Sequence, residues 1–326
     1  MGSGRWSTDV YTAAASYRAA TGRSAFDWSD RIRRRPRGDW VAHPTLDPRG
    51  VAARESRDSD EHPTSLAIAV LFDVTGSMGN VPVVLQTKLP QLFGLLVRKG
   101  YAAHPQVLFG AIGDATCDRV PLQIGQFESD NRTDTDLGNI LLEGGGGGQM
   151  TESYELALYF MARHSSIDCF ERRGRRGYLF VIGDELAYPE AKAEEVRRVI
   201  GDDLAENVPL AQVLAEARRR YDVYYVLPQG AHYAGDDRVL AFWRHHLGQN
   251  VIQLDDLDAV CETIALTIGL GEGSIDVATG LADLDDVGSD KAATVGRALA
   301  RLGPRALIGG GPLPAGGGGP SGAVRL

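Results

Sequence analysis

Four apolar runs recur along the chain, and segments with the spacing of an amphipathic helix lie between them and after the last. The runs are SLAIAVLFD (65–73), QVLFGAIGDA (106–115), GYLFVIGDE (177–185) and DVYYVLP (222–228). Continuous apolar runs of this length are typical of strands buried on both faces of a sheet. Because strands alternate with helices, the sequence predicts an α/β fold: a doubly wound, mostly parallel sheet with helices on both faces.

Shorter segments complete the predicted core. VPLQIGQF (120–127) alternates apolar and polar residues and is expected to pair as an edge strand, and NVIQL (250–254) is a short strand. The apolar residues of segment 81–100 lie on one face at helical spacing. Pro90 in the middle of that segment is expected to kink the helix.

The composition changes at both ends of this pattern. Residues 65–271 are predicted to form the sheet domain, and the polar, Arg-rich residues 1–64 an irregular extension that packs on it and contains one short helix. Residues 272–302 are expected to be a linker with room for one amphipathic helix at 289–302. Residues 303–326 are rich in Gly and Pro and are expected to be disordered.

Charge and length exclude several classes of protein. The formal net charge of -9 disfavours nucleic acid and anionic membranes as partners. No apolar run reaches the roughly 18 to 20 residues of a membrane span, and the first twenty residues lack the apolar segment of a signal peptide. We therefore expect a cytoplasmic protein. The basic runs at 31–37 and 172–176 are expected to be solvated surface.

Three of the predicted strands end in an aspartate: Asp73, Asp114 and Asp184. A single aspartate at such a position often caps the next helix. Ligands of doubly wound sheets bind at the carboxyl ends of the strands, where these three side chains are expected to gather. Oxygen ligands of this kind suit a hard divalent cation, Mg²⁺ or Mn²⁺.

The segment LFDVTGSMGN (71–80) adds two hydroxyl side chains to the first of these strand ends. Asp73, Thr75 and Ser77 alternate, so their oxygen atoms are expected to reach one point. Because hydroxyl groups are neutral ligands, a metal bound by them keeps positive charge and attracts a further anionic ligand. A carboxylate from a partner protein, Asp or Glu, fits this requirement.

The motif DVTGSM resembles the D-x-[ST]-x-S signature of von Willebrand factor A (VWA) domains, whose metal-ion-dependent adhesion site is known as MIDAS. The family fold is an open parallel sheet with one short antiparallel edge strand. The resemblance implies that Thr151 and Asp184 join Asp73, Thr75 and Ser77 as metal ligands. It implies metal-dependent protein binding and no catalysis.

The sequence departs from the family pattern near these positions. Glu185 follows Asp184 where family members usually carry glycine, and Glu152 follows Thr151. Asp114 does not belong to the common motif. We predict that Asp114 and Glu152 contact the ligands or water molecules bound to the metal.

The same residues allow one enzymatic alternative. DVTGS is also similar to the D-K-T-G-T motif of phosphotransferases of haloacid-dehalogenase type, in which Asp73 would be the nucleophile. Position 74 is Val where that motif has lysine, and no carboxylate stands two residues after Asp73. Lysines such as Lys88 and Lys192 lie in no motif that would balance the charge of a phosphoryl group. A vestigial metal site on the same scaffold is the remaining alternative.

The resemblance also implies a class of partner. Cytoplasmic VWA proteins of bacterial type often act as adaptors for MoxR-type AAA+ ATPases or for stress-response systems. We therefore expect a protein partner that offers a carboxylate to the metal.

Overall fold

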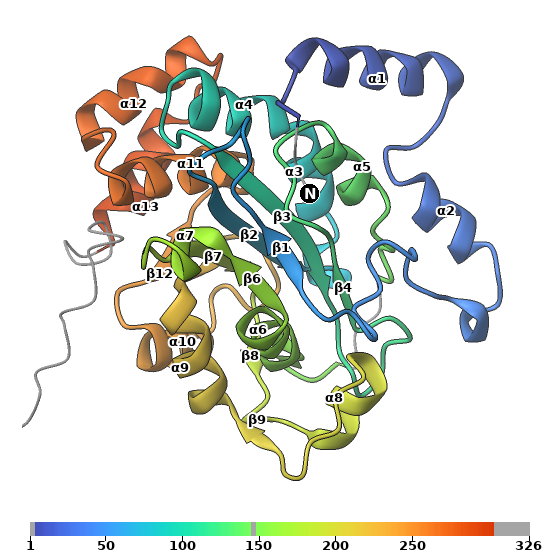
Figure 1. Cartoon of the computed structure of the whole chain (residues 1–326). Helices are drawn as coiled ribbons and strands as arrows, with labels where there is room; N and C mark the ends of the chain where they lie inside the picture. Colours follow the sequence, from blue (N-terminus) through green and yellow to red (C-terminus); the bar gives the residue numbers. More distant parts are fainter. Residues whose placement is uncertain (1–3, 145–147, 303–326) are drawn as a thin grey trace, which may run out of the picture.

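The computed structural model describes residues 4–144 and 148–302, so the predicted disordered tail lies outside the described residues. A six-stranded sheet runs through the centre in the order β12-β11-β7-β2-β3-β4 (Figure 1). All neighbouring strands pair in parallel except β4, which pairs antiparallel with β3 at the edge. The strands are β2 (Leu66–Asp73), β3 (Pro105–Ile112), β4 (Leu122–Ile124), β7 (Gly177–Ile182), β11 (Tyr221–Pro228) and β12 (Val251–Leu254).

Helices cover both faces of the sheet, which confirms the predicted doubly wound architecture. One face is packed by α3 (Val81–Thr87), α4 (Leu89–Phe93) and α11 (Val260–Gly271). The other is packed by α6 (Tyr154–Arg163), α8 (Ala193–Val199), α9 (Leu210–Arg220) and α10 (Asp237–Leu247). Every residue of β2 and β3 is buried, as expected for strands with helices on both sides.

The predicted kink at Pro90 is a break between two helices. Helix α3 ends at Thr87, and α4 begins at Leu89 with Pro90 in its first turn, where a missing N–H costs no hydrogen bond. A π-helical turn, Gly94–Arg98, follows. No helix in the described residues is long and apolar enough to cross a membrane.

Smaller elements connect or cover the sheet. They are α1 (Thr8–Thr21), α2 (Asp27–Arg33), β1 (Arg54–Ser56), α5 (Arg132–Gly138), β5 (Thr151–Glu152), β6 (Ser165–Ile167), α7 (Asp168–Glu171), β8 (Leu186–Ala187), β9 (Glu190–Ala191), β10 (Val208–Pro209), α12 (Val277–Asp286) and α13 (Ala292–Ala300). Strand β10 pairs antiparallel with β9 in a separate two-stranded ribbon.

The N-terminal extension packs on the core, as expected, but is more regular than the sequence suggests. Trp6 stacks on Phe93 with ring centroids 4.4 Å apart, and the Tyr11 hydroxyl donates to the Gln86 carbonyl at 2.8 Å. Strand β1 pairs in parallel with β6. These contacts attach α1 and β1 to different parts of the sheet domain, so the extension belongs to the folded unit.

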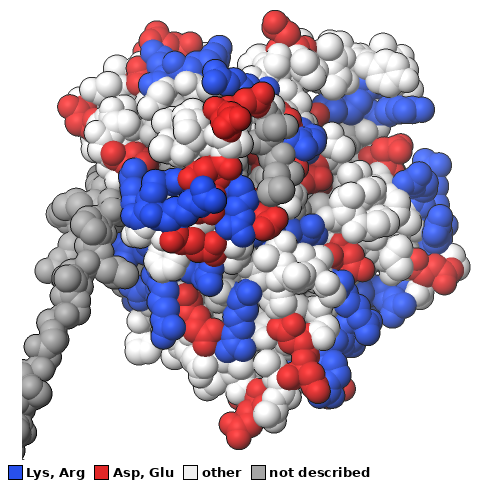
Figure 2. Space-filling view, viewed as in Figure 1, with Lys and Arg blue, Asp and Glu red and all other residues white. Residues whose placement is uncertain are grey.

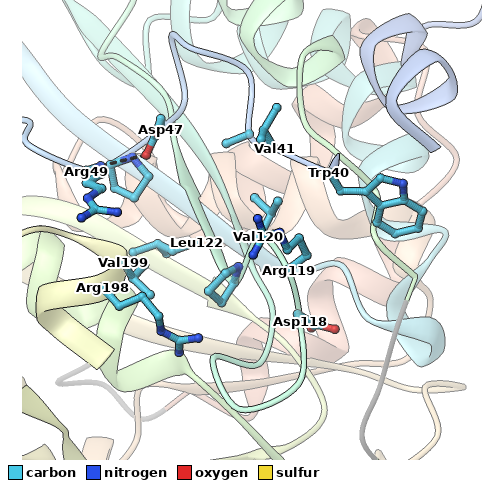
Figure 3. Close-up of a pocket in the computed structure, with 13 residues that line it drawn as sticks. Trp40, Val41, Asp47, Arg49, Asp118, Arg119, Val120, Leu122, Arg198 and Val199 are labelled. Carbon is cyan, nitrogen blue, oxygen red and sulfur yellow. Dashed lines mark hydrogen bonds between the residues drawn. The ribbon is translucent and has the colours of Figure 1, made fainter. Parts of the chain in front are cut away.

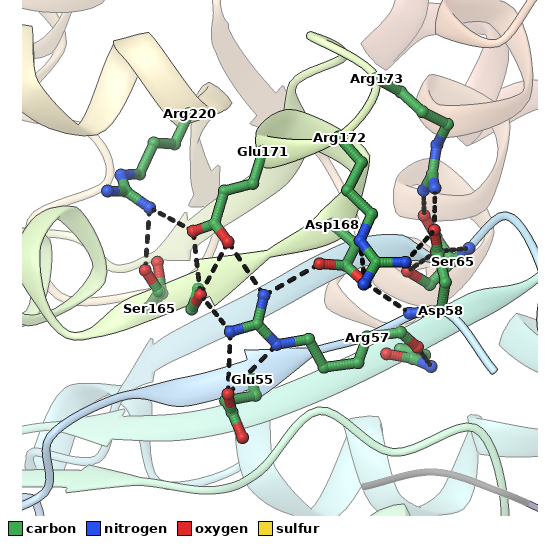
Figure 4. A network of polar contacts seen from close by, with 12 residues as sticks. Glu55, Arg57, Asp58, Ser65, Ser165, Asp168, Glu171, Arg172, Arg173 and Arg220 are labelled. Atoms are coloured by element: carbon green, nitrogen blue, oxygen red, sulfur yellow. Dashed lines mark hydrogen bonds and ion pairs between the residues drawn. The ribbon is translucent and has the colours of Figure 1, made fainter.

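A network of ion pairs fastens the end of this extension (Figure 4). The Arg57 guanidinium donates to Asp168 at 2.9 Å, to Glu171 at 2.9 Å and to Glu55 at 2.9 Å. Asp168 is 1% exposed, and it also accepts a hydrogen bond from the backbone N–H of Asp58. Arg57 therefore joins the extension to α7 beside β2.

The basic run at 172–176 lies on the surface, as the sequence predicts, with the side chains of Arg172 and Arg175 65% and 46% exposed, and it is also paired with carboxylates. Each of its arginines faces a carboxylate from another part of the chain. The pairs are Arg172 with Asp58 and Asp168, Arg173 with Asp58, Arg175 with Glu272, and Arg176 with Asp222. Tertiary contacts bring most of these carboxylates to the run from segments distant in sequence.

Residues 272–302 form two helices, α12 and α13, where the sequence suggests a linker with one helix. Leu284, Val295 and Leu299 are buried in the same core cluster as residues of α11. The amphipathic helix predicted at 289–302 corresponds to α13. Because these apolar residues pack on the sheet domain, the segment extends the core on that side.

We predict that Arg57→Ala lowers the free energy of unfolding by about 1–3 kcal/mol, because it removes a cation from the buried carboxylate of Asp168. Arg197→Ala is the matched control, since its partner Asp203 is an 84% exposed side chain and such pairs contribute about 0–1 kcal/mol. Urea denaturation measures both. Equal losses in the two variants would show that the network stabilises no more than a surface pair.

Candidate metal site

Asp73 ends β2 and starts a tight turn. Its side chain is fully buried, and its Oδ1 atom accepts hydrogen bonds from the Thr75 backbone N–H and from Thr75 Oγ1, both at 2.6 Å. The Oδ2 atom accepts from the Tyr154 hydroxyl at 3.2 Å. These bonds fix the carboxylate and the Thr75 hydroxyl side by side, and a 3-10 turn at Gly76–Met78 follows.

Asp184 lies at the neighbouring strand end. It follows β7 by two residues, and β7 pairs with β2 in a register that places Phe72 opposite Ile182. Asp184 is fully buried, and its Oδ2 atom accepts from the Tyr233 backbone N–H at 3.0 Å. The two aspartates therefore meet at the carboxyl edge of adjacent parallel strands, as predicted.

Thr151 is tied to the same edge by a short parallel ladder. Strand β5 pairs with β8, with Thr151 opposite Leu186, two residues after Asp184. The Leu186 backbone N–H also donates to the Met150 carbonyl at 3.1 Å. Of the five predicted ligands, the structure thus places four on adjoining segments. The backbone of Ser77 belongs to the turn after Asp73, and its side chain lies outside what the structure describes.

Asp114 follows the third strand end and is held by donors of the protein itself. Its carboxylate is fully buried and accepts from the Thr116 backbone N–H at 2.8 Å, from the Tyr188 hydroxyl at 3.1 Å and from the Gln149 amide. Glu152 is 2% exposed, and its Oε2 atom has no hydrogen-bond partner among the described residues. Both residues lie near the predicted ligands. The carboxylate of Asp114 accepts several hydrogen bonds, whereas Oε2 of Glu152 accepts none from the described residues.

The buried carboxyls at this edge raise one another's pKa. Burial and the charge of Asp184 raise the pKa of Asp73 to about 7, against the opposing effect of its bonds to Thr75. Burial, Asp73 and Glu185 raise the pKa of Glu152 to about 11. Burial, Asp73 and Asp184 raise the pKa of Glu185 to about 8. A cation at this edge would favour the ionised forms of all three.

The donor set fits a hard divalent cation. Asp73, Asp184 and two threonine hydroxyls supply only oxygen ligands, and the unpartnered Oε2 atoms of Glu152 and Glu185 add unsatisfied acceptors. In the described residues, no three His, Cys, Asp or Glu side chains are grouped to hold a metal. A site of two aspartates and three hydroxyls contains only two such residues, so this finding does not bear on it.

Three aromatic residues that the sequence did not indicate pack next to the strand ends that carry Asp73 and Asp184. Tyr225 stacks on Trp243 with centroids 4.0 Å apart, and Tyr154 packs edge-on against both rings. Tyr225 and Trp243 also donate to the Glu185 carbonyl at 3.1 and 2.8 Å. Tyr154 lies in an apolar helix, and no sequence pattern indicates that its hydroxyl reaches Asp73.

Gly183 is required by this packing. A Cβ atom at position 183 would lie 2.0 Å from the Tyr154 hydroxyl oxygen. The glycine before Asp184 therefore lets the tyrosine approach between the two strand ends.

No protein-family model matches this sequence, and no curated protein matches it. Solved structures with a similar backbone include a pilus adhesin, SpaC from Lactobacillus rhamnosus GG, in an open conformation. It is 10% identical with a TM-score of 0.45, and the match covers 66% of this chain and 31% of the adhesin. Another is proximal thread matrix protein 1 from the mussel byssus, at 11% identity and a TM-score of 0.39, covering 66% of this chain and 49% of that one. Similarity at this level carries no functional inference.

We predict that Asp73→Asn changes how stability depends on pH in metal-free buffer. The folded wild type keeps a proton on Asp73 up to about pH 7, and the unfolded chain releases it near the ordinary value of 3.8, so wild-type stability falls as pH rises through this window. Asparagine does not ionise, and its oxygen still accepts the bonds from Thr75. The variant should therefore gain at least about 1 kcal/mol on the wild type between pH of about 5 and 8.

Urea denaturation in EDTA at several pH values measures this difference. Asp168→Asn is the control, because its buried carboxylate is paired with Arg57 and its loss should lower stability. A constant difference between Asp73→Asn and the wild type across this pH range would contradict the prediction.

Proposed function

We propose that this chain is a metal-dependent protein-interaction module of the VWA type, with a MIDAS-like site for Mg²⁺ or Mn²⁺. One observation carries the proposal: two fully buried aspartates, Asp73 and Asp184, lie at the carboxyl ends of adjacent parallel strands. The hydroxyl of Thr75 contacts the first, and Thr151 is paired beside the second. Buried carboxylates are costly to ionise without a cation, and a metal would supply it.

In this proposal the metal is held by Asp73, Thr75, Ser77, Thr151 and Asp184. The Thr75 hydroxyl donates its proton to Asp73 and still has lone pairs for a metal, so its observed hydrogen bond is compatible with ligation. Asp114 and Glu152 would contact water molecules around the ion.

The bound cation would supply an electrophilic position for an incoming carboxylate. An ion bound by two carboxylates and neutral hydroxyl groups can still take a further anionic oxygen as a ligand. A protein partner that presents Asp or Glu would complete the shell. We propose an adaptor role of this kind in the cytoplasm, with a MoxR-type AAA+ ATPase as one such partner.

No observation favours the phosphotransferase alternative. Its chemistry needs a lysine near the phosphoryl group, and the lysines of this chain are paired with carboxylates elsewhere. The pairs are Lys88 with Glu262, Lys99 with Asp283, Lys192 with Glu195, and Lys291 with Asp256.

We predict that Mg²⁺ stabilises the wild-type chain and has no effect on Asp73→Asn. An excess of about one hundred times the dissociation constant stabilises a folded protein by about 2.7 kcal/mol. Thermal unfolding at about pH 8, with and without EDTA, should show a corresponding rise in Tm for the wild type. Calorimetric titration of Mg²⁺ gives the stoichiometry, which we expect to be one ion per chain.

Asp168→Asn is again the matched control, because it removes a buried carboxylate away from the proposed ligands. It should have a lower Tm and keep the full response to Mg²⁺. Stabilisation of Asp73→Asn equal to that of the wild type would place the metal elsewhere and refute the assigned ligands.

We further predict that partner binding needs both the metal and Asp73. Immobilised wild-type protein in Mg²⁺ should retain a host protein that it loses in EDTA, and Asp73→Asn should lose it in both buffers. The retained protein is then tested by replacing its surface Asp and Glu residues. Retention that is equal in Mg²⁺, in EDTA and with the variant would show that binding uses another surface.

A further inference from the structure

A separate pocket lies between the N-terminal extension and the antiparallel edge of the sheet (Figure 3). It has a volume of about 270 Å³. Residues 40–49 of the extension form one wall, residues 118–122 at β4 a second, and the end of α8 a third. Since liquid water takes about 30 Å³ per molecule, the space is several times larger than a single water or ion needs.

Three arginines, one from each wall, line this pocket: Arg49, Arg119 and Arg198. None of them forms an ion pair with any described residue. Arg198 donates one N–H to the Ala115 carbonyl at 2.5 Å, which fixes its side chain and leaves other N–H groups available. All three side chains are exposed to solvent, and with the two aspartates of the lining, Asp47 and Asp118, the pocket has an excess of positive charge in a chain whose net charge is -9.

Neither acidic residue of the pocket forms an ion pair with its three arginines. The Asp118 carboxylate pairs with Arg37 at 3.4 Å and accepts the Asp114 backbone N–H at 2.8 Å. The Asp47 carboxylate accepts the Arg49 backbone N–H at 2.9 Å. The guanidinium groups of Arg119 and Arg198 are thus available to an anion from solution.

The rest of the lining is apolar. Val120, Leu122 and Val199 lie beside the arginines, and the half-buried Trp40 contributes an indole whose N–H donates to the Arg35 carbonyl at 3.0 Å. That bond holds the ring in place. A ligand that fits this lining carries an anionic group for the arginines and an apolar or planar part for the remaining surface.

We propose that this pocket binds a small organic phosphate monoester. Arginine presents planar, forked N–H donors that match phosphate oxygens, and a phosphate monoester brings nearly two negative charges to three arginines. This site is distinct from the proposed metal site and adds a second ligand class to the chain.

A polyanion such as nucleic acid fits less well. Acidic and basic side chains are intermingled over the face shown in Figure 2, with no continuous basic surface there. A long phosphate backbone would meet many carboxylates on a chain of this net charge, whereas a small phosphate meets only the pocket.

Calorimetric titration of the full chain in EDTA tests the proposal, with adenosine monophosphate, inorganic phosphate and adenosine as probes. We expect binding of adenosine monophosphate and weaker binding of inorganic phosphate, because the latter lacks the apolar part. Arg119→Gln and Arg198→Gln should each raise the Kd by about tenfold, the effect of losing a charge-assisted hydrogen bond. Arg219→Gln, an exposed arginine on α9, is the charge-matched control and should leave the Kd unchanged.

The proposal would be overturned by no binding of either phosphate at millimolar concentration, or by equal loss of affinity in Arg119→Gln and Arg219→Gln. Adenosine binding as tight as its monophosphate would also overturn it, since the arginines would then contribute nothing. Asp73→Asn should bind adenosine monophosphate like the wild type, and Arg119→Gln should keep the response to Mg²⁺. The two proposals can therefore fail independently.

Discussion

The arrangement of the candidate metal site depends on the parallel pairing of β2 with β7. Both strands are buried on both faces, and the two aspartates at their carboxyl ends are buried as well: Asp73 is the last residue of β2, and Asp184 lies two residues after β7. Two carboxylates in such a place repel each other and lose hydration, and both effects oppose ionisation. The two hydrogen bonds from Thr75 offset part of this cost for Asp73. A bound cation would therefore make it easier for the two aspartates to ionise.

The loops around this edge are also held by bonds that do not involve the aspartates. The β5–β8 ladder places Thr151 beside the chain that follows Asp184, and Tyr225 and Trp243 hold the Glu185 carbonyl. Pre-positioned oxygen ligands lose little freedom when an ion binds, so this support would favour affinity. The unpartnered Oε2 atoms of Glu152 and Glu185 remain the least satisfied groups of the edge.

Residue patterns predicted the sheet, and the meeting of the two strand-end aspartates, because both follow from simple rules. Apolar runs identify buried strands, and strand-end aspartates meet wherever parallel strands are neighbours. Tyr154 escaped prediction because an apolar helix gives no sign of where a hydroxyl will point. Strand β1 and helix α12 were also missed, because their order depends on partners distant in sequence, such as β6 for β1. The ligand roles assigned to the hydroxyls stay predictions, and for Ser77 the side chain is not described.

The acidic edge and the arginine-lined pocket share one structural support, the turn after β3. Asp118 closes this turn by accepting the Asp114 N–H, and a Cβ atom at Gly113 would lie 2.7 Å from the Asp118 carboxylate. On one side the Ala115 N–H donates to Ser153 in the loop that carries Thr151, and on the other the Ala115 carbonyl accepts from Arg198. A single turn thus positions the Thr151 loop and one arginine of the pocket. The hydrogen bonds of this turn are made within the chain, so the turn can position the acidic edge and the arginine-lined pocket only a few residues apart.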